Sequence, residues 1–331
     1  MQTRSLGRTG LKVTPLCLGT MTFGNQADEQ TSFAILDRAF SAGVRFIDTA
    51  DMYPLGGGLE LVGRTETIVG HWLAGRRQEV VLATKCFGTM GEGPNDRGLS
   101  RKHVMQAVED SLRRLGTDYL DLYQAHQFDE TVPLEETLEA FSDLVRQGKV
   151  RYVGVSNWRA WQVAKAMGLK EKSGLAPIAS VQPRYNLLFR MVEDELVPYC
   201  REAGIGIIPY NPLAGGLLTG RYRPGQDIEA GTRFALRQAG ELYRGRYWHE
   251  PTFSAVERYR AWCQEHGRDL ATTAVQWVLC QPGITAPILG ASRPEQLEAS
   301  LRALEAAPLS PEDLAFLNTL WFDLPRRREA R

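Results

Sequence analysis

Residues 43–53 read GVRFIDTADMY, a short apolar run that stops at an aspartate and is followed, after a turn, by a tyrosine. The run from Val44 to Ile47 has the composition of a buried strand. Asp48, at its end, is costly to bury unless a cation pairs with it. In parallel α/β folds the carboxyl ends of the strands also carry the active site. The stretch therefore raises two questions: which cation pairs with Asp48, and whether Tyr53 shares that cation.

The rest of the chain repeats this alternation of strand and helix. We expect strands at residues 15–18, 46–48, 80–84, 119–124, 150–155, 178–182, 205–210 and 285–289. We expect helices at residues 29–42, 66–74, 101–115, 134–147, 158–168, 192–203, 252–266, 272–280 and 294–304. Regular alternation indicates a parallel sheet, and about eight such units are the size of a closed (β/α)8 TIM barrel.

The residues outside these units predict three additions to the barrel. They are an N-terminal β-hairpin at residues 4–16, a long loop after strand 7 at residues 211–251, and an extra C-terminal helix at residues 311–320 followed by a basic tail at 326–328. A doubly wound sheet is the alternative, but the sequence contains no G-x-G-x-x-G motif and no linker that would divide it. We therefore expect a single α/β domain over residues 1–331.

The composition of the chain restricts the kinds of partner that the protein is expected to bind. Lys+Arg and Asp+Glu both number 39, and this balance gives no electrostatic fit to nucleic acid or to an anionic membrane. The five cysteines are scattered without the spacing of a metal site or a disulfide framework. Neither a leader sequence nor a membrane-spanning run is evident. These features predict a cytoplasmic protein without a metal, nucleic-acid or membrane partner.

Four polar side chains fall at or just beyond predicted strand ends: Asp48, Tyr53, Lys85 and His126. Lys85 is the cation that Asp48 requires. A phenol has a pKa of about 10, and a neighbouring ammonium lowers it by stabilising the phenolate. His126 can donate a hydrogen bond to a substrate oxygen. The set suits protonation of a carbonyl oxygen on which negative charge develops.

Each of these residues also has a structural interpretation. An Asp–Lys pair in a barrel can be purely structural, a strand histidine can be a core residue, and Tyr53 can be a loop aromatic. Their joint occurrence at successive strand ends favours the functional interpretation.

Four further motifs strengthen the functional interpretation of these residues. They are GVSN at 154–157, SVQ at 180–182, YNPLAGGLLTG at 210–220 and GAS at 290–292. With them the chain resembles an aldo-keto reductase. Residues 211–222 and 244–250 are most similar to the aflatoxin-aldehyde reductase branch. Residues 91–115 are more similar to the branches of channel β subunits and bacterial general reductases. The resemblance implies a (β/α)8 barrel that reduces aldehydes and ketones with NADPH, with Asp48, Tyr53, Lys85 and His126 as its catalytic tetrad.

The resemblance also implies a cofactor site. Ser156, Asn157 and Gln182 would hold the carboxamide, Tyr210 would stack on the nicotinamide, and the 2′-phosphate would lie near Arg293. The full set of implied cofactor contacts is Gly19, Thr20, Ser156, Asn157, Gln182, Tyr210, Asn211, Pro212, Leu213, Gly215, Leu217, Arg221, Arg233, Gly290, Ser292, Arg293, Gln296 and Ser300. The family's usual Glu-Asn pair is replaced here by Ala299-Ser300, and a common lysine by Ala291, which weakens the case for NADPH over NADH.

The expected reaction is hydride transfer from the nicotinamide to a carbonyl carbon, with Tyr53 as general acid. The substrate would lie against the aromatic residues Phe23, Phe87, Trp158 and Trp248. Two alternatives stay open: a cofactor-binding regulatory subunit, although channel β subunits carry Asn where His126 stands, and an NADP-dependent sugar or alcohol dehydrogenase that works oxidatively. The small-molecule carbonyl substrate and the oligomeric state are left undefined.

Overall fold

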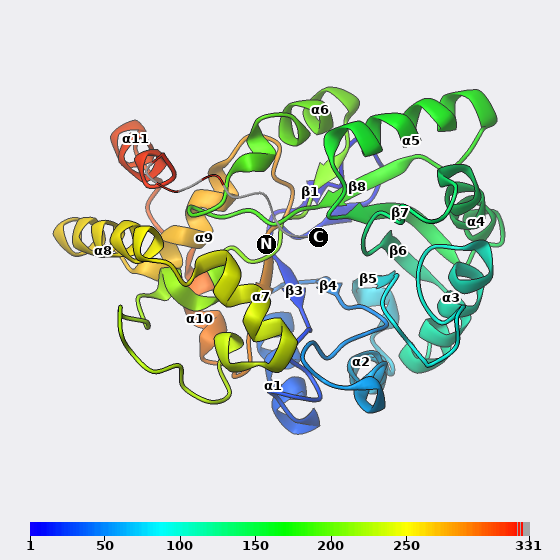
Figure 1. Ribbon diagram of the computed structural model, residues 1–331, viewed down its shortest axis with the longest axis horizontal. Coiled ribbons are helices and arrows are strands. Elements are labelled where there is room, and N and C mark those ends of the chain that lie inside the picture. The colour runs from blue at the N-terminus through cyan, green and yellow to red at the C-terminus, as the bar shows by residue number, and fades with distance from the viewer. Residues whose placement is uncertain (323, 325, 327–331) are drawn as a thin grey trace.

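The computed structural model describes residues 1–322, 324 and 326, so residues 327 and 328 of the predicted basic tail lie outside the described residues. Its centre is an eight-stranded parallel sheet surrounded by helices (Figure 1). In sheet order the strands are β10 (Ile288–Gly290), β3 (Cys17–Gly19), β4 (Phe46–Asp48), β5 (Val81–Cys86), β6 (Leu120–Ala125), β7 (Val150–Ser156), β8 (Ile178–Gln182) and β9 (Gly206–Ile207).

The sheet closes on itself between β9 and the segment that leads into β10. Single parallel bridges join Ile207 to Ile284 and Tyr210 to Ile288. The backbone N–H groups of Thr285 and Ile288 donate to the carbonyl oxygens of Ile207 and Pro209, each at 2.8 Å. This seam is irregular because Pro209 has no N–H to give to a ladder. The predicted strand at 205–210 is accordingly reduced to β9, but the (β/α)8 barrel is confirmed.

All the predicted helices are present, with boundaries shifted by a few residues. They are α1 (Glu29–Ser41), α2 (Arg64–Leu73), α3 (Arg101–Leu115), α4 (Leu134–Arg146), α5 (Ala160–Ser173), α6 (Leu196–Ala203), α8 (Glu250–Glu265), α9 (Leu270–Cys280), α10 (Gln296–Arg302) and α11 (Pro311–Thr319). The starts of α1 and α3 were predicted accurately because each has a capping residue. The side chains of Asp28 and Ser100 accept hydrogen bonds from the backbone N–H groups of the first turns of these helices.

The long segment after β9 differs from the prediction of a loop. It contains short 3-10 turns at Ala214–Thr219 and Arg233–Ala235 and an additional helix, α7 (Arg237–Tyr247). Gly240 and Gly245 weaken the helical signal of α7 in the sequence. Tertiary packing compensates, because Tyr243 and Tyr247 are both buried.

Inside the barrel, side chains form layers because alternate residues of a strand face the same way. Phe46, Ala83 and Leu122 lie in one buried apolar cluster at the centre of the sheet. Two residues further along the same strands stand Asp48, Lys85 and Gln124, each at most 2% exposed. Strand register places Lys85 opposite Gln124. The alternation that fills the barrel with apolar side chains therefore also stacks a polar layer directly above them.

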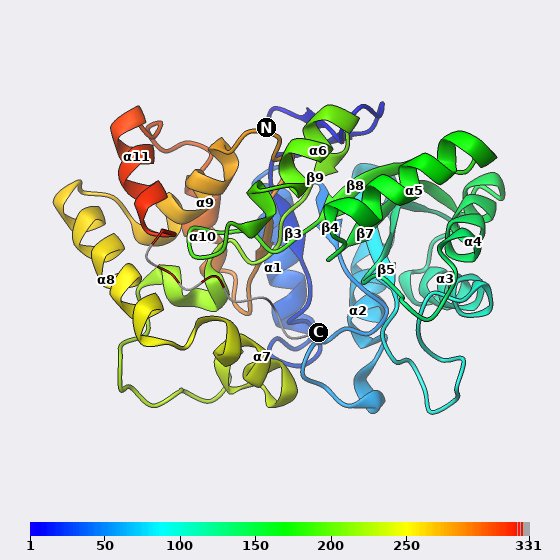
Figure 2. The ribbon, with the colours of Figure 1, turned by 45° about the horizontal axis from the view of Figure 1, so that its top comes forward.

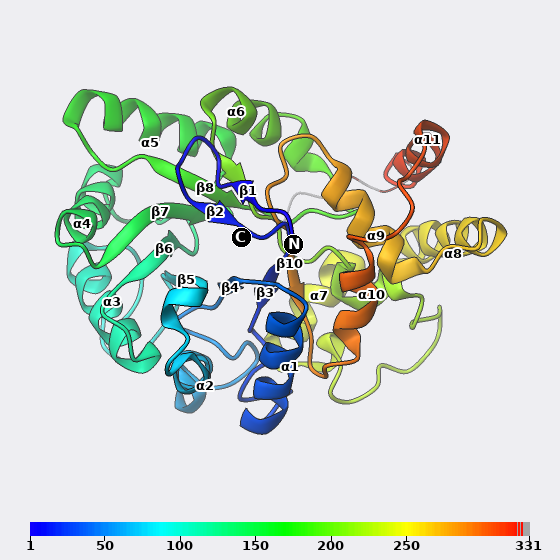
Figure 3. The ribbon, with the colours of Figure 1, turned by 180° about the vertical axis from the view of Figure 1, so that it is seen from behind.

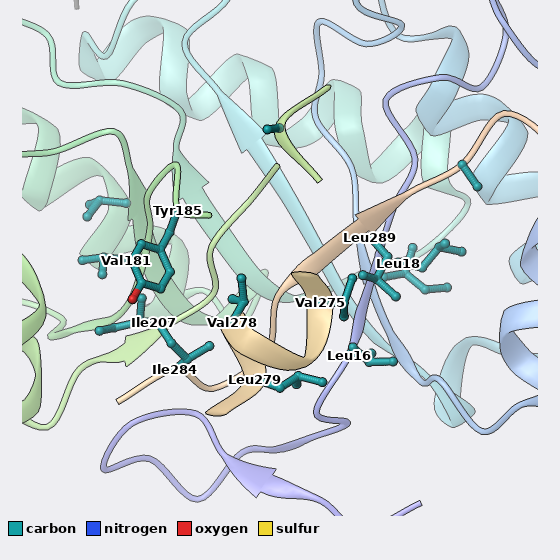
Figure 4. Packing of buried hydrophobic residues seen from close by; sticks show 14 of the residues in the cluster. Leu16, Leu18, Val181, Tyr185, Ile207, Val275, Val278, Leu279, Ile284 and Leu289 are labelled. Atoms are coloured by element: carbon teal, nitrogen blue, oxygen red, sulfur yellow. The ribbon is translucent and has the colours of Figure 1, made fainter. Parts of the chain in front are cut away.

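The other face of the strands packs against the surrounding helices. Figure 4 shows one part of this layer, where Val275, Val278 and Leu279 of α9 face residues of the strands and the segments that flank them. Leu18 of β3 and Leu289 of β10 belong to the same buried cluster. Helix α9 thus covers the seam of the barrel from outside.

The predicted N-terminal hairpin consists of β1 (Arg4–Ser5) and β2 (Lys12–Val13), paired antiparallel. It lies across one end of the barrel (Figure 3), where Leu6 and Val13 complete the inner apolar cluster. Arg4 donates to the carbonyl oxygens of Ile284 and Thr285 at 3.1 and 3.3 Å. Figure 2 shows that α7 lies at the opposite end of the barrel.

Helices α2 and α3 meet at a glycine. A Cβ atom at Gly70, inside α2, would lie 2.3 Å from the carbonyl oxygen of Arg114, too close for any real contact. We expect Gly70→Ala to destabilise the protein by about 1–3 kcal/mol, as overpacking does. The matched control is Gly168→Ala inside α5, where a Cβ meets nothing within 4 Å. It should stabilise the protein by about 0.5–1 kcal/mol. Urea unfolding of both variants checks the contrast, and a stable Gly70→Ala protein would refute the close packing.

Candidate active site

Asp48 and Lys85 form a fully buried ion pair at the carboxyl ends of β4 and β5. The Lys85 Nζ donates to Asp48 Oδ1 at 2.5 Å and to the carbonyl oxygen of Thr49 at 2.7 Å. The second carboxylate oxygen of Asp48 accepts from the side-chain amides of Gln124 and Gln182, each at 3.0 Å. Every charge in this layer therefore has a partner, as burial requires.

Tyr53 lies above this pair, on the turn that follows β4. Its ring centroid is 5.0 Å from Lys85 Nζ, and the side chain is 8% exposed. Burial raises the pKa of Tyr53, and the positive charge of Lys85 opposes that rise without cancelling it. The expectation of a net lowering therefore does not hold in the protein alone, because desolvation outweighs the ammonium. Burial disfavours the charged form of Lys85, but Asp48 and Tyr53 outweigh it, and the pKa of Lys85 lies above its usual value.

His126 follows β6 and faces Tyr53, with 5.7 Å between the ring centroids. Burial, and then the charge of Lys85, hold the pKa of His126 well below its ordinary value. The imidazole is therefore neutral at pH 7, with one nitrogen as donor and one as acceptor. Its Nδ1 is buried and has no hydrogen-bond partner within the described part of the chain. A neutral ring next to a phenol and an ammonium can hydrogen-bond a substrate oxygen.

A cavity of about 640 Å³ opens above this cluster. Asp48, Tyr53 and His126 line it, whereas Lys85 lies behind Asp48 and does not reach the surface of the cavity. Most of the predicted cofactor residues also line it: Gly19, Ser156, Asn157, Gln182, Tyr210, Asn211, Pro212, Leu213, Gly215, Arg221, Arg233, Gly290, Ser292, Gln296 and Ser300. Thr20 and Leu217 are fully buried behind the wall, and Arg293 is exposed outside it.

Hydrogen bonds link a row of polar side chains in the cavity wall next to Tyr53 and His126. Tyr210 donates to Asn157 Oδ1 at 2.9 Å, and Asn157 Nδ2 donates to Ser156 Oγ at 3.1 Å. The Ser156 hydroxyl in turn donates to the carbonyl oxygen of Gln182 at 2.9 Å. Asn157 has a φ of 60°, in the left-handed region that asparagine tolerates better than most residues. The set offers amide and hydroxyl groups beside an aromatic ring, which suits a planar carboxamide.

Further along the cavity stand two arginines with different environments. Arg221 pairs with Glu229, so an anionic ligand would compete with that carboxylate. Arg233 Nη1 donates to the hydroxyl of Tyr243 at 3.3 Å and contacts Met21 Sδ at 3.8 Å. Both guanidinium groups are suited to a phosphate.

At its far end the cavity reaches the start of α10. The Ser292 N–H donates to Gln296 Oε1 at 2.8 Å. Helix α10 begins at Gln296, so the predicted start at residue 294 was two residues early. Arg293 lies in the turn before the helix, and its exposed side chain has no partner among the described residues.

Three of the four predicted substrate aromatics do not face the cavity. Phe87 lines it, but Phe23, Trp158 and Trp248 do not. The Trp158 ring packs edge-on to Phe128 at 4.9 Å, and Phe23 is fully buried in the core. Large aromatic rings near strand ends are used here for packing, which sequence alone does not distinguish from substrate contact.

Several lining residues were missed: Met21, Met52, Leu55, Gln127, Leu242, Tyr243 and Arg246. Leu242, Tyr243 and Arg246 belong to α7, which the sequence did not reveal. Met52 and Leu55 stand on either side of Tyr53 and could have been inferred from that proximity. The described residues contain no cluster of three or more side chains suited to a metal ion. Within the same residues, no helix has the length and apolar character needed to cross a membrane.

The chain belongs to the aldo/keto reductase family, whose model matches residues 15–321. It is 42% identical over 328 residues to the uncharacterized oxidoreductase YrpG of Bacillus subtilis, covering 97% of this chain and 96% of the relative. A probable voltage-gated potassium channel subunit beta of Oryza sativa is 37% identical, covering 100% and 99%. The L-glyceraldehyde 3-phosphate reductase of Escherichia coli is 34% identical, covering 95% and 91%. Family membership and the two relatives named as an oxidoreductase and a reductase support an oxidoreductase function.

Proposed function

We propose that the protein reduces aldehydes or ketones to alcohols with NADPH in the cytoplasm, with Tyr53 as the general acid. The observation that carries the proposal is the cluster of Asp48, Lys85, Tyr53 and His126. Lys85 Nζ lies 2.5 Å from Asp48, and the rings of Tyr53 and His126 face each other across 5.7 Å at the base of the cavity. A phenol, a neutral imidazole and a buried ammonium together suit protonation of a carbonyl oxygen.

The cavity supplies groups that fit a nicotinamide dinucleotide. Asn157, Ser156 and Gln182 would hold the carboxamide, and Tyr210 beside them would stack on the ring. Gly215 and Gly216 also line the cavity, and their positive φ values of 70° and 102° are ones that glycine adopts without strain. Arg221 and Arg233 would neutralise phosphate groups, in the first case by exchanging Glu229 for the ligand.

The reduced nicotinamide, when bound, supplies the hydride. The protein supplies the proton for the carbonyl oxygen and the positive charge that stabilises the group left behind. Tyr53 gives its proton to the carbonyl oxygen, and Lys85 stabilises the phenolate that remains. Asp48 holds Lys85 charged and in place, and neutral His126 donates a hydrogen bond to the same oxygen and fixes its position.

The test is a cofactor-oxidation screen with the purified protein over aldehydes, ketones, quinones and keto-sugars. We expect steady-state oxidation of NADPH with at least one class. The relatives named as channel subunits raise the alternative of a regulatory, cofactor-binding protein, and tight NADPH binding without turnover on any class would favour it. Faster rates with NADP⁺ and alcohols or sugars would instead favour an oxidative enzyme.

Arg293 gives a prediction about cofactor choice. Arg293 is exposed and follows Ser292, which lines the far end of the cavity, so its side chain would have to turn toward the cavity to reach a 2′-phosphate. Charge-assisted hydrogen bonds contribute about 1.5–3 kcal/mol, or roughly 10- to 150-fold in affinity. We expect Arg293→Ala to weaken NADPH binding by that order and to leave NADH binding nearly unchanged, as measured by fluorescence titration.

The matched control for this prediction is Arg302→Ala, which removes an exposed arginine at the other end of α10. It should change neither affinity. Equal losses for both cofactors in Arg293→Ala, or no loss for either, would remove Arg293 from the phosphate site and leave Arg221 or Arg233 in that role.

A further inference from the structure

Gln124 of β6 is a fully buried amide in the polar layer of the barrel, and its side chain does not line the cavity. It pairs in register with Lys85 on one side and with Gly154 on the other. A Cβ atom at Gly154 would lie 3.0 Å from Gln124 Cγ, so the glycine leaves the space that this side chain occupies. Because Gln124 lies behind the cavity wall, it acts on the reaction only through the residues that it contacts.

Both polar atoms of the Gln124 amide are hydrogen-bonded. Its Nε2 donates to Asp48 Oδ2 at 3.0 Å, and its Oε1 accepts from Gln182 Nε2 at 3.1 Å. Gln182 Nε2 also donates to Asp48 Oδ2 at 3.0 Å. A carboxylate only accepts hydrogen bonds, so the charge of Asp48 requires both amides to turn their NH2 groups toward it. The three side chains therefore form a closed triangle with one consistent set of donors and acceptors.

This triangle bears on the charge state of the Asp48–Lys85 pair. Lys85 Nζ lies 2.5 Å from Asp48 Oδ1, and both side chains are buried. Burial penalises both charges, so the alternative for so close a pair is a neutral acid beside a neutral amine. Hydrogen bonds to the ionised form of a carboxylate favour that form. The two amide donors on Oδ2 therefore oppose transfer of the Lys85 proton to Asp48. A neutral Lys85 would no longer stabilise the phenolate of Tyr53.

We propose that Gln124 is a positioning residue that holds the Asp48–Lys85 pair in its charge-separated form. Gln124 touches neither the cofactor nor the substrate, and it acts on Tyr53 through Asp48 and Lys85. This inference rests on the proposed carbonyl reduction. It adds to the four reacting residues a fifth residue on which the charge of Lys85 depends.

The first experiment replaces the amide and keeps the length of the side chain. We expect Gln124→Met to lower kcat roughly 10- to 100-fold, as loss of one hydrogen bond to a charged group does. NADPH affinity should change less than about threefold, because Gln182 keeps its own bond to Asp48. Thermal melting checks folding, and Gln124→Leu serves as a second apolar variant if Gln124→Met does not fold. Equal losses in kcat and in NADPH affinity would overturn the proposal.

The matched control is Ser180→Ala. Ser180 is fully buried beside Gln124, since the same added Cβ at Gly154 would lie 2.6 Å from Ser180 Oγ. This hydroxyl has no hydrogen-bond partner within the described part of the chain. Its removal should leave both kcat and the pH profile unchanged. A loss of kcat as large as that of Gln124→Met would show that the layer responds to packing alone.

The pH profile separates a change of charge from a loss of packing. The charge of Lys85 lowers the pKa of Tyr53 against the effect of burial. A variant with less charge on Lys85 should therefore show its alkaline limb at higher pH, and an unchanged limb would overturn the proposal. The other titratable groups that interact electrostatically with Lys85 or Tyr53 stay in place in the variant; they are Cys17, Asp48, Asp51, His126 and Tyr243.

A double-mutant cycle tests whether the effect passes through Asp48. In the Asp48→Asn background there is no carboxylate for the amide to hold. Gln124→Met should then change the residual kcat less than about twofold, because the two replacements remove the same interaction. The same fold-loss in both backgrounds would show that Gln124 acts by another route.

Carboxyl 13C NMR of protein labelled at aspartate measures the charge of Asp48 without turnover. The Asp48 signal is the one that disappears in Asp48→Asn. At pH 7 it should have the shift of an ionised carboxylate in the wild type and move toward that of the acid in Gln124→Met. A protonated Asp48 in the wild type, or the same shift in both proteins, would overturn the role of Gln124. If the wild type oxidises NADPH with no carbonyl compound, the proposed function fails, and the NMR result still decides what Gln124 does.

Discussion

Tyr53→Phe should bind NADPH within a few-fold of the wild-type affinity and yet lose nearly all turnover. The ring stays in place between Lys85 and His126, so the shape of the cavity is retained. Only the proton donor is lost, and loss of one general acid typically costs about 10²–10⁴-fold in rate. The measurement is kcat for carbonyl reduction, with cofactor affinity determined by titration on the same preparation.

The control for this variant is Tyr222→Phe, which removes another buried phenol from the same cavity. Its effect on kcat should be far smaller. A Tyr53→Phe protein that retains more than about a tenth of the wild-type kcat would show that the proton comes from another group, and His126 would be the next candidate.

Lys85→Met should be nearly as inactive, for a different reason. The variant removes the ammonium that stabilises the Tyr53 phenolate and leaves Asp48 as an unpaired, buried carboxylate. Breaking a buried pair in this way costs about 3–5 kcal/mol of stability. A loss of activity alone would therefore be ambiguous, and the unfolding free energy has to be measured beside kcat.

The double variant Asp48→Asn with Lys85→Met resolves the ambiguity. It removes both charges, so the free energy of unfolding should recover part of its loss, while turnover should not recover. If activity returned together with stability, Lys85 would be a structural residue only.

The pH profile gives an independent readout of the coupling. Reduction needs protonated Tyr53, so the rate falls as pH rises through the pKa of that phenol. Burial raises this pKa and Lys85 counteracts the rise. Removing Lys85 removes the lowering influence, so the pKa goes up and the alkaline limb should move to higher pH in whatever activity remains. An alkaline limb at the same pH in Lys85→Met would rule out the electrostatic link.

The barrel and its reacting cluster could be predicted because local chemistry determines them. Apolar runs mark the strands, and glycines mark the ends of several helices, such as Gly116 after α3 and Gly204 after α6. A buried Asp48 requires a cation, which strand order provides in Lys85. Period-two alternation then places both in one layer above Phe46. The predictions about Asp48, Lys85 and His126 needed only the strand ends, which were located within one or two residues.

The part of the cavity wall that α7 forms could not be predicted in the same way. Helix α7 contains two glycines and gains its order from contacts with Gly215, Arg233 and other distant residues, which no local pattern encodes. The sequence also assigned Trp158 and Trp248 to the substrate, although both pack against other aromatic rings. Which face of a large ring meets a ligand depends on the neighbours that folding brings to it.

The seam of the barrel has a consequence for biosynthesis. Arg4 is bound by carbonyl groups 280 and 281 positions later in the chain, and Arg8 by the carbonyl of Gly204. While a ribosome is still translating, Arg4 waits without its two acceptors until residue 285 has emerged, whereas the acceptor of Arg8 emerges about 80 residues earlier. A chain that stops short of residue 284 leaves Arg4 without these acceptors and the edge of β9 without its bridge to Ile284.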